Sequence, residues 1–286
     1  MKIVQPDQVE FSAASIHREG ATFRQQLFDG PTAVDNFSLV IARAGARFSP
    51  RHRHSFEQYR YQLEGDAEYG KTGTLKQGML GYFPEGMHYG PQTQSADGKE
   101  QTVLALQCGG ASGSGYVSRD EQLACAKELK TMGTFKDGVF HRNPGLPGKK
   151  NLDGSQAIWE HIMKKELVYP KPRYAAPIFM HPENFDWVAL KDAPGVSEKF
   201  MGMFSERETG ASFIKIEPGA RYTPAGNRDI YCVLSGNGSI GPESYQYSTS
   251  VFLDHGDHGD QAAFTAQDAT EILHFSLPDL SEIQTV

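Results

Sequence analysis

The stretch that decides the fold runs from Gly45 to Gly65 and reads GARFSPRHRHSFEQYRYQLEG. Side chains of an extended chain alternate with a period of two, so His52 and His54 face the same side. Two imidazoles on one face predict a two-point clamp for a metal ion. Gln58 has the same parity and can add an oxygen ligand, although this set does not choose among metals. Taken alone, the pair is equally compatible with solvated histidines at a strand end.

Parts of this stretch recur later in the chain. Three blocks return in the same order with conservative changes: 45–50 as 219–224, 61–65 as 232–236, and 83–92 as 252–261. Such ordered self-similarity indicates a duplicated β domain. The second copy has Ala225, Gly226 and Asn227 where the histidine pair should stand. We therefore expect no metal in the second copy, and we interpret the polar run from Asp254 to Asp260 as a solvated connection.

Short β-branched and aromatic runs between Gly and Pro residues predict many short strands, typical of a sandwich or barrel. The predicted strands are 37–42, 59–63, 81–83, 102–107, 212–216, 230–234, 250–253 and 271–275. Two helices are expected between the repeats, at Ser118 to Met132 and Ser155 to Glu166. Ser118 and Glu121 have the spacing of a capping box, and Gly133 is a stop signal.

The pattern G45-x6-H52-x-H54-x3-Q58-x6-G65 resembles the first motif of the cupin superfamily, and G78-x5-P84-x-G86-M87-H88-Y89 resembles the second. The resemblance implies an all-β bicupin of two RmlC-like jelly-roll barrels with a few connecting helices. We expect an N-terminal barrel with the metal site at 1–115, a helical and loop connection at 116–170, and a degenerate C-terminal barrel at 171–286.

Two departures from the cupin pattern affect the expected site. Gln58 stands where the family usually has Glu, and strand alternation points Glu57 away. In the second motif His88 lies one position short, and Tyr89 takes the usual ligand position. Either Tyr89 acts as a ligand or as a nearby hydroxyl, or a local bulge brings His88 inward. The expected metal ligands are therefore His52, His54, Gln58 and His88, with Tyr89 as a catalytic residue.

Arg60 is the second expected catalytic residue, because parity with Gln58 directs it into the barrel. A buried guanidinium needs partners. Arg60 is compatible with an internal ion pair to Glu85 or another carboxylate and, equally, with a bidentate contact to a substrate carboxylate or enolate. Tyr82 is expected near the same mouth, where it could orient a substrate.

The composition of the chain excludes several classes of binding partner. The chain has 286 residues, with 28 Lys+Arg against 35 Asp+Glu and a net charge of −7. The sequence lacks the clustered Lys and Arg residues that are typical of nucleic-acid binders. It also has no apolar run that is long enough to span a bilayer. The first residues lack the apolar stretch of a secretory signal. We expect a cytoplasmic protein with a small-molecule substrate and no nucleic-acid or membrane partner, as a monomer with an internal pseudo-dimer or as a homodimer.

The resemblance and these residues together predict a metal-dependent cupin enzyme with one divalent ion, which could be Fe, Mn, Ni or Zn. The expected substrate is a small molecule that bears a carboxylate or an enol, and dioxygenase chemistry is one outcome. The alternatives are a non-redox cupin hydrolase, cyclase or isomerase, and a non-catalytic bicupin that binds a small molecule.

Overall fold

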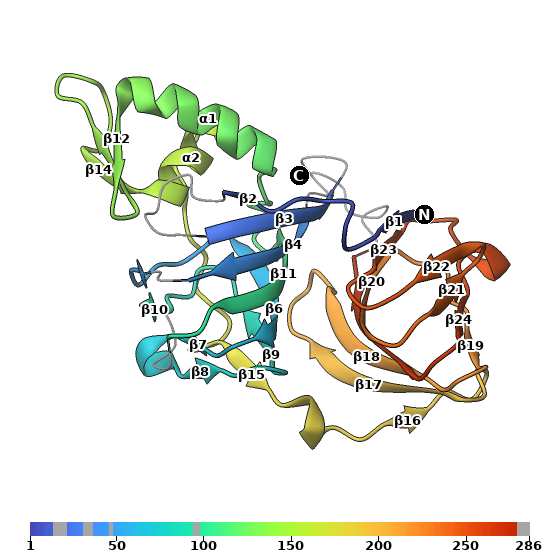
Figure 1. Ribbon diagram of the computed structural model, residues 1–286. Helices are drawn as coiled ribbons and strands as arrows, with labels where there is room; N and C mark the ends of the chain where they lie inside the picture. Colours follow the sequence, from blue (N-terminus) through green and yellow to red (C-terminus); the bar gives the residue numbers. More distant parts are fainter. Residues whose placement is uncertain (14–21, 31–36, 46–47, 94–97, 279–286) are drawn as a thin grey trace. The chain divides into compact units, whose positions relative to one another are not determined.

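The computed structural model describes residues 1–13, 22–30, 37–45, 48–93 and 98–278 (Figure 1). Ala46 and Arg47, which belong to the first repeat block, lie outside the described residues. The chain divides into two compact units. The first unit is Phe11–Met180, and the second joins Met1–Glu10 to His181–Val286.

The first unit contains a seven-stranded sheet in the order β15-β9-β6-β11-β4-β3-β2 and a four-stranded sheet in the order β5-β10-β7-β8. Its strands are β2 (Ser12–Ala13), β3 (Thr22–Asp29), β4 (Phe37–Ala44), β5 (Phe48–Ser49), β6 (Phe56–Glu64), β7 (Ala67–Glu68), β8 (Thr74–Leu75), β9 (Leu80–Phe83), β10 (Gln92–Thr93), β11 (Gln101–Gly109) and β15 (Ile178–Met180), with the short helix η1 (Gly70–Thr72).

The second unit repeats this arrangement strand for strand, in the orders β1-β23-β20-β25-β18-β17-β16 and β19-β24-β21-β22. Its elements are β1 (Lys2–Val4), η2 (Pro182–Asn184), β16 (Val188–Ala189), β17 (Val196–Met203), β18 (Gly210–Ile216), β19 (Arg221–Tyr222), β20 (Asp229–Ser235), β21 (Gly238–Ile240), β22 (Glu243–Tyr245), β23 (Ser250–Leu253), η3 (Gly259–Gln261), β24 (Phe264–Ala266) and β25 (Thr270–Ser276). The duplication predicted from the repeated blocks is confirmed, as are all eight predicted strands.

Each unit includes one edge strand that lies outside its own sequence repeat. β1 opens the chain but pairs with β23 of the second unit, with Ile3 opposite Val251. β15 directly precedes the second unit but pairs with β9 of the first, with Phe179 opposite Gly81. The expected boundaries at 115 and 170 therefore differ from the compact units, because residues 1–10 group with the second unit and residues up to 180 with the first.

The connection between the repeats belongs to the first unit and gathers at one end of it (Figure 1). α1 (Arg119–Met132) begins with the predicted capping box, in which the Ser118 side chain accepts from the Glu121 backbone N–H. α2 (Gly154–Met163) ends three residues earlier than predicted, because Lys164 adopts a left-handed φ of 53°. Neither of these α-helices, which lie in the described part of the chain, is long and apolar enough to cross a membrane.

A small sheet that the sequence did not predict completes this connection. It consists of β12 (Gly133–Lys136), β13 (Val139–Arg142) and β14 (Asn151–Asp153). The Asp153 side chain then caps α2 by accepting from the backbone N–H groups of Ser155 and Gln156. Buried side chains of both helices and of the sheet share one core, among them Leu129, Phe140 and Ile158. The connection is thus a packed subdomain that can hold side chains in fixed positions.

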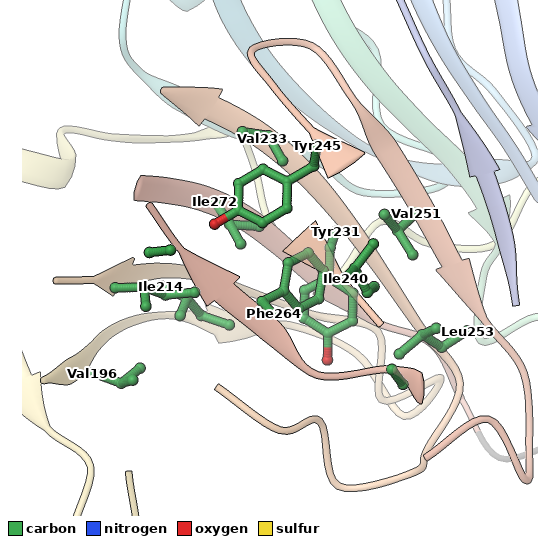
Figure 2. Close-up of a cluster of buried hydrophobic side chains, with 13 residues drawn as sticks. Val196, Ile214, Tyr231, Val233, Ile240, Tyr245, Val251, Leu253, Phe264 and Ile272 are labelled. Carbon is green, nitrogen blue, oxygen red and sulfur yellow. The ribbon is translucent and has the colours of Figure 1, made fainter. Parts of the chain in front are cut away.

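The interior of the second barrel is packed with apolar side chains, 13 of which form one buried cluster (Figure 2). In the repeat alignment Asp229 and Tyr231 stand where the first barrel has Gln58 and Arg60. Asp229 is buried and bonded to His274 Nε2 at 2.8 Å. The second barrel therefore replaces the polar interior column of the first barrel with an aromatic core and a hydrogen bond between His274 and Asp229.

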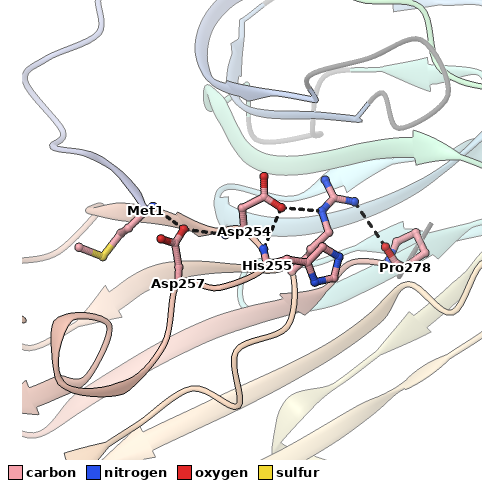
Figure 3. Close-up of polar contacts among 6 residues, drawn as sticks. Met1, Asp254, His255, Asp257 and Pro278 are labelled. Atoms are coloured by element: carbon pink, nitrogen blue, oxygen red, sulfur yellow. Dashed lines mark hydrogen bonds and ion pairs between the residues drawn. The ribbon is translucent and has the colours of Figure 1, made fainter. Parts of the chain in front are cut away.

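The polar run from Asp254 to Asp260 serves as a structural connection (Figure 3). Asp254 accepts from Arg228 Nε at 3.1 Å, and Arg228 also donates to the Pro278 carbonyl at 3.4 Å. Asp257 pairs with the Met1 amino group, and the backbone N–H of Asp254 donates to it. Among the described residues, no group of three or more His, Cys, Asp or Glu side chains is arranged to hold a metal ion.

Candidate active site

The histidine pair lies on the segment between β5 and β6. His52 forms an isolated bridge with Tyr89, closed by two backbone hydrogen bonds of 3.1 and 3.0 Å. This bridge holds the two side chains together, with ring centroids 4.6 Å apart. The centroids of His52 and His54 are 4.9 Å apart, and the planes are nearly perpendicular. The structure thus brings both predicted imidazoles and the Tyr89 ring into one cluster.

The tautomer of His52 suits metal binding. Its Nδ1 lies 2.7 Å from the carbonyl oxygen of Pro50. A carbonyl only accepts, so Nδ1 carries the proton and Nε2 carries the lone pair. A ligating histidine normally donates its other ring N–H to a carbonyl or carboxylate in this way. The imidazole pair therefore fits a divalent ion in its donor chemistry.

Gln58 is inside the barrel, as its parity predicts, but its amide oxygen is already engaged. Oε1 accepts from Arg60 Nε at 3.2 Å, from Arg60 Nη2 at 2.7 Å and from Gln107 Nε2 at 3.2 Å. A carbonyl oxygen has two lone pairs. Gln58 therefore does not present a free oxygen to a metal ion in this arrangement, unlike the expected ligand.

Arg60 is the centre of this network. It donates to the hydroxyls of Tyr69 at 2.7 Å and Tyr89 at 2.9 Å, and its guanidinium carbon lies 4.4 Å from the centroid of the Phe83 ring. The pKa of Arg60 is raised above its ordinary value, because Tyr69 and Tyr89 outweigh the burial that alone would lower it. The network therefore holds a permanent positive charge beside Gln58 and Tyr89.

Of the two alternatives for Arg60, the ion pair with Glu85 is not formed. Glu85 accepts instead from the backbone N–H of Ser112 at 2.7 Å and from its hydroxyl at 2.8 Å. The Glu85 carboxylate is therefore hydrogen-bonded to Ser112 and not to Arg60. Within the described part of the chain, Arg60 donates to phenols and an amide in place of a carboxylate.

His88 and Tyr89 take opposite positions. Tyr89 is 1% exposed and packs in the barrel, whereas His88 is exposed. Burial, together with the positive charges of Arg53 and Arg51, lowers the pKa of His88. The bridge at Tyr89 leaves no bulge that would turn His88 inward. Between the two alternatives of the sequence, the structure brings Tyr89 to the histidine pair.

Tyr82 lies on the other face of the sheet, away from the expected mouth. It is buried against Tyr59, with ring centroids 5.1 Å apart. Burial and a hydrogen bond to Glu57 raise the pKa of Tyr82. Glu57 thus points away from Gln58, as alternation predicts, and Tyr82 is not among the cavity-lining side chains.

A cavity of about 210 Å³ opens beside the histidine pair. His54, Gln58 and Arg60 line it from the barrel, and Trp159 and Tyr169 line it from the connection between the repeats. Four arginines line the cavity: Arg24, Arg53, Arg60 and Arg119. The described lining residues include no Asp or Glu. The cavity is therefore strongly cationic.

The sequence pattern did not reveal three of these arginines. Arg24 lies on β3, which was not predicted, and Arg119 is the first residue of α1. Arg53 lies between the two histidines, where strict alternation would turn it away from them. The segment is not a regular strand, and Arg53 lines the cavity with its guanidinium 3.8 Å from the Tyr169 ring centroid. Its place between the histidines was the one available signal.

No protein-family model matches the chain, and no curated protein sequence matches it. Solved structures match over nearly its full length. A candidate dioxygenase from Nostoc punctiforme is 12% identical, with 99% of this chain and 85% of that chain covered and a TM-score of 0.62. A bacterial pirin from Escherichia coli, in complex with nickel(II), is 11% identical, with 97% and 98% covered and a TM-score of 0.56.

A mutant of oxalate decarboxylase from Bacillus subtilis is 12% identical, with 97% of this chain and 77% of that chain covered and a TM-score of 0.54. At such identities the likeness concerns the fold. Together with the strand orders, it confirms the expected fold class, an all-β chain of duplicated cupin jelly-roll barrels.

Proposed function

We propose that the first barrel is a metal-dependent cupin enzyme that acts on a small molecule bearing a carboxylate or an enol. The observation that carries the proposal is the imidazole pair, with His52 in the ligating tautomer and His54 on the wall of a cationic cavity. The similar pirin structure holds nickel(II), which supports a divalent metal in this fold.

His52 and His54 would hold the ion, and Gln58 and Tyr89 would remain bound to Arg60. A bound divalent ion supplies Lewis acidity toward a substrate oxygen or, if it is iron, a place for dioxygen. The candidate dioxygenase among the similar structures supports the second chemistry, and hydrolase, cyclase or isomerase chemistry fits the first. The chain's own part is to orient an anionic substrate with its arginines and to exclude water beneath the connecting subdomain.

Metal content tests this proposal. Tag-free protein should contain about one equivalent of divalent metal by elemental analysis, and the double variant His52→Ala/His54→Ala should lose it, because the imidazoles are the ligands. His88→Ala is the matched control, since this exposed histidine lies next to the cluster in the sequence. Metal-free wild type after reconstitution with iron, manganese, nickel and zinc would overturn the proposal, and so would an unchanged double variant.

A non-catalytic barrel that binds a small molecule is the second candidate. It is favoured by the bonds that tie Gln58 and Tyr89 to Arg60, because these bonds compete with a third and a fourth ligand. Such a protein would bind the same anions without a metal. Retained ligand binding in a protein that takes up no metal would select this candidate.

A further inference from the structure

The positive charge of the cavity favours the binding of an anion. Four guanidinium groups and no described carboxylate line about 210 Å³. All four arginines are partly buried, and positive charge that is partly removed from water is costly unless an anion compensates it. Arg60 donates to Gln58 and two phenols, and Arg24 donates to Gln26, Ser38 and Gln107. These two arginines are committed to protein acceptors, so their N–H groups are not the first that a ligand would meet.

Arg53 differs from both. Its guanidinium stacks on the Tyr169 ring, with the carbon 3.8 Å from the ring centroid. Among the described residues its guanidinium makes no hydrogen bond or ion pair with the protein. Stacking occupies the face of a guanidinium and leaves its N–H edge available for the bidentate contact that suits a carboxylate. Arg53 also lines the cavity next to His54.

The rest of the wall is apolar and aromatic. Phe56 stacks on His54 with centroids 4.5 Å apart, and it lines the cavity together with Trp159 and Leu167. The Trp159 ring is held by a 3.2 Å hydrogen bond from Nε1 to the Ser114 carbonyl. A site with a few polar anchors and apolar walls is typical of a small-molecule pocket. The ligand should therefore carry an apolar body as well as a negative charge.

We infer that the cavity binds a small carboxylate with a flat apolar body, and that Arg53 is the residue that holds the carboxylate. Arg24, Arg60 and Arg119 add positive charge to the same space. Phe56 and Trp159 take the apolar body. This inference deepens the proposed function by naming the class of substrate and its anchor, and it rests on that function only in treating the bound carboxylate as the substrate.

Benzoate is the probe that tests it. In a Trp187→Phe background, Trp159 is the remaining tryptophan and reports binding in the cavity, while calorimetry gives the affinity. Benzoate should bind saturably. Benzamide, which lacks the charge, and acetate, which lacks the apolar body, should each bind more weakly. Arg53→Gln should weaken benzoate about tenfold or more, the effect of losing a charge-assisted hydrogen-bond pair.

Arg51→Gln is the matched control, because Arg51 lies on the same segment but is exposed and does not line the cavity. Its benzoate affinity should equal that of wild type. No saturable binding of benzoate at millimolar concentration would overturn the inference, and so would equal affinities of Arg53→Gln and wild type.

The titration is repeated on wild type stripped of metal with a chelator. Benzoate binding that persists there and still needs Arg53 supports the anion site even if elemental analysis finds no metal in the protein. Failure of the metal proposal and failure of the anion site are therefore seen in different measurements.

Discussion

Replacing Gly86 by alanine is expected to destabilise the first unit by about 2–5 kcal/mol, from roughly 1–2 for a left-handed residue with a Cβ and roughly 1–3 for overpacking. Gly86 has a φ of +73°, and a Cβ there would lie 2.3 Å from the carbonyl oxygen of Pro170. The backbone of the connecting segment must then move. Chemical denaturation of the full chain measures the loss as a fall in the free energy of unfolding.

Gly78→Ala separates the two causes. Gly78 has a similar φ of +81°, but a Cβ added there would meet no described atom within 4 Å. It should lose only the conformational part, about 1–2 kcal/mol. Equal losses in the two variants would contradict the importance of the Pro170 contact. Since Tyr169 precedes Pro170 and stacks on Arg53, Gly86→Ala should also weaken benzoate, whereas Gly78→Ala should not.

Arg60→Met is expected to tighten the binding of divalent metal by about tenfold or more. The guanidinium now donates to Gln58 and Tyr89, the two groups nearest to the role of further ligands. Two like unit charges about 4 Å apart repel by about 4 kcal/mol at an effective dielectric constant near 20, and a divalent ion doubles this repulsion. Even a third of the unit-charge value corresponds to about a tenfold change in affinity. Methionine fills much of the volume without the charge. Competition with a chromogenic chelator gives the affinities for zinc and nickel.

Arg24→Met removes the same charge from the same cavity as a control. Arg24 donates to Gln26, Ser38 and Gln107 but makes no hydrogen bond to Gln58 or Tyr89. Its effect on metal affinity should be clearly smaller. Weaker metal binding in Arg60→Met would contradict this account and would mean that Arg60 supports the metal site by positioning Gln58 or Tyr89. Unchanged affinity would mean that the ion does not sit beside the network.

The barrel architecture could be predicted from the sequence because the patterns that indicate it are local. Turn glycines and prolines, alternating strands and the repeated blocks each involve neighbouring residues, and the capping box at Ser118 is likewise contained within one turn. The pairing of β1 with β23 and of β15 with β9 could not be predicted in this way. Each is a three-residue strand, and its partner is chosen by the three-dimensional arrangement. β3 was not predicted because polar side chains such as Arg24 and Gln26 interrupt the run of β-branched and aromatic residues that indicates a strand.

The candidate site shows the same difference between what local patterns predict and what they do not. Parity placed Gln58 and Arg60 in the interior, and both line the cavity. Parity does not tell which acceptors a guanidinium will find. The partners of Arg60 come from η1's neighbour Tyr69 and from Tyr89, which depend on how separate strands close the barrel. The cationic wall likewise joins residues from distant segments, so no single stretch of the sequence displays it.

The sequence positions of β1 and β15 limit when each sheet can be completed during synthesis. The first unit is complete in sequence once β15 has been made, so it can close while the second unit is still being translated. β1 is made before its partner β23 and can pair with it only after β23 has emerged. At roughly 5–20 residues per second, the roughly 250 intervening residues take about 12–50 s to synthesise. Through that interval the ribosome-bound chain carries β1 without its partner strand.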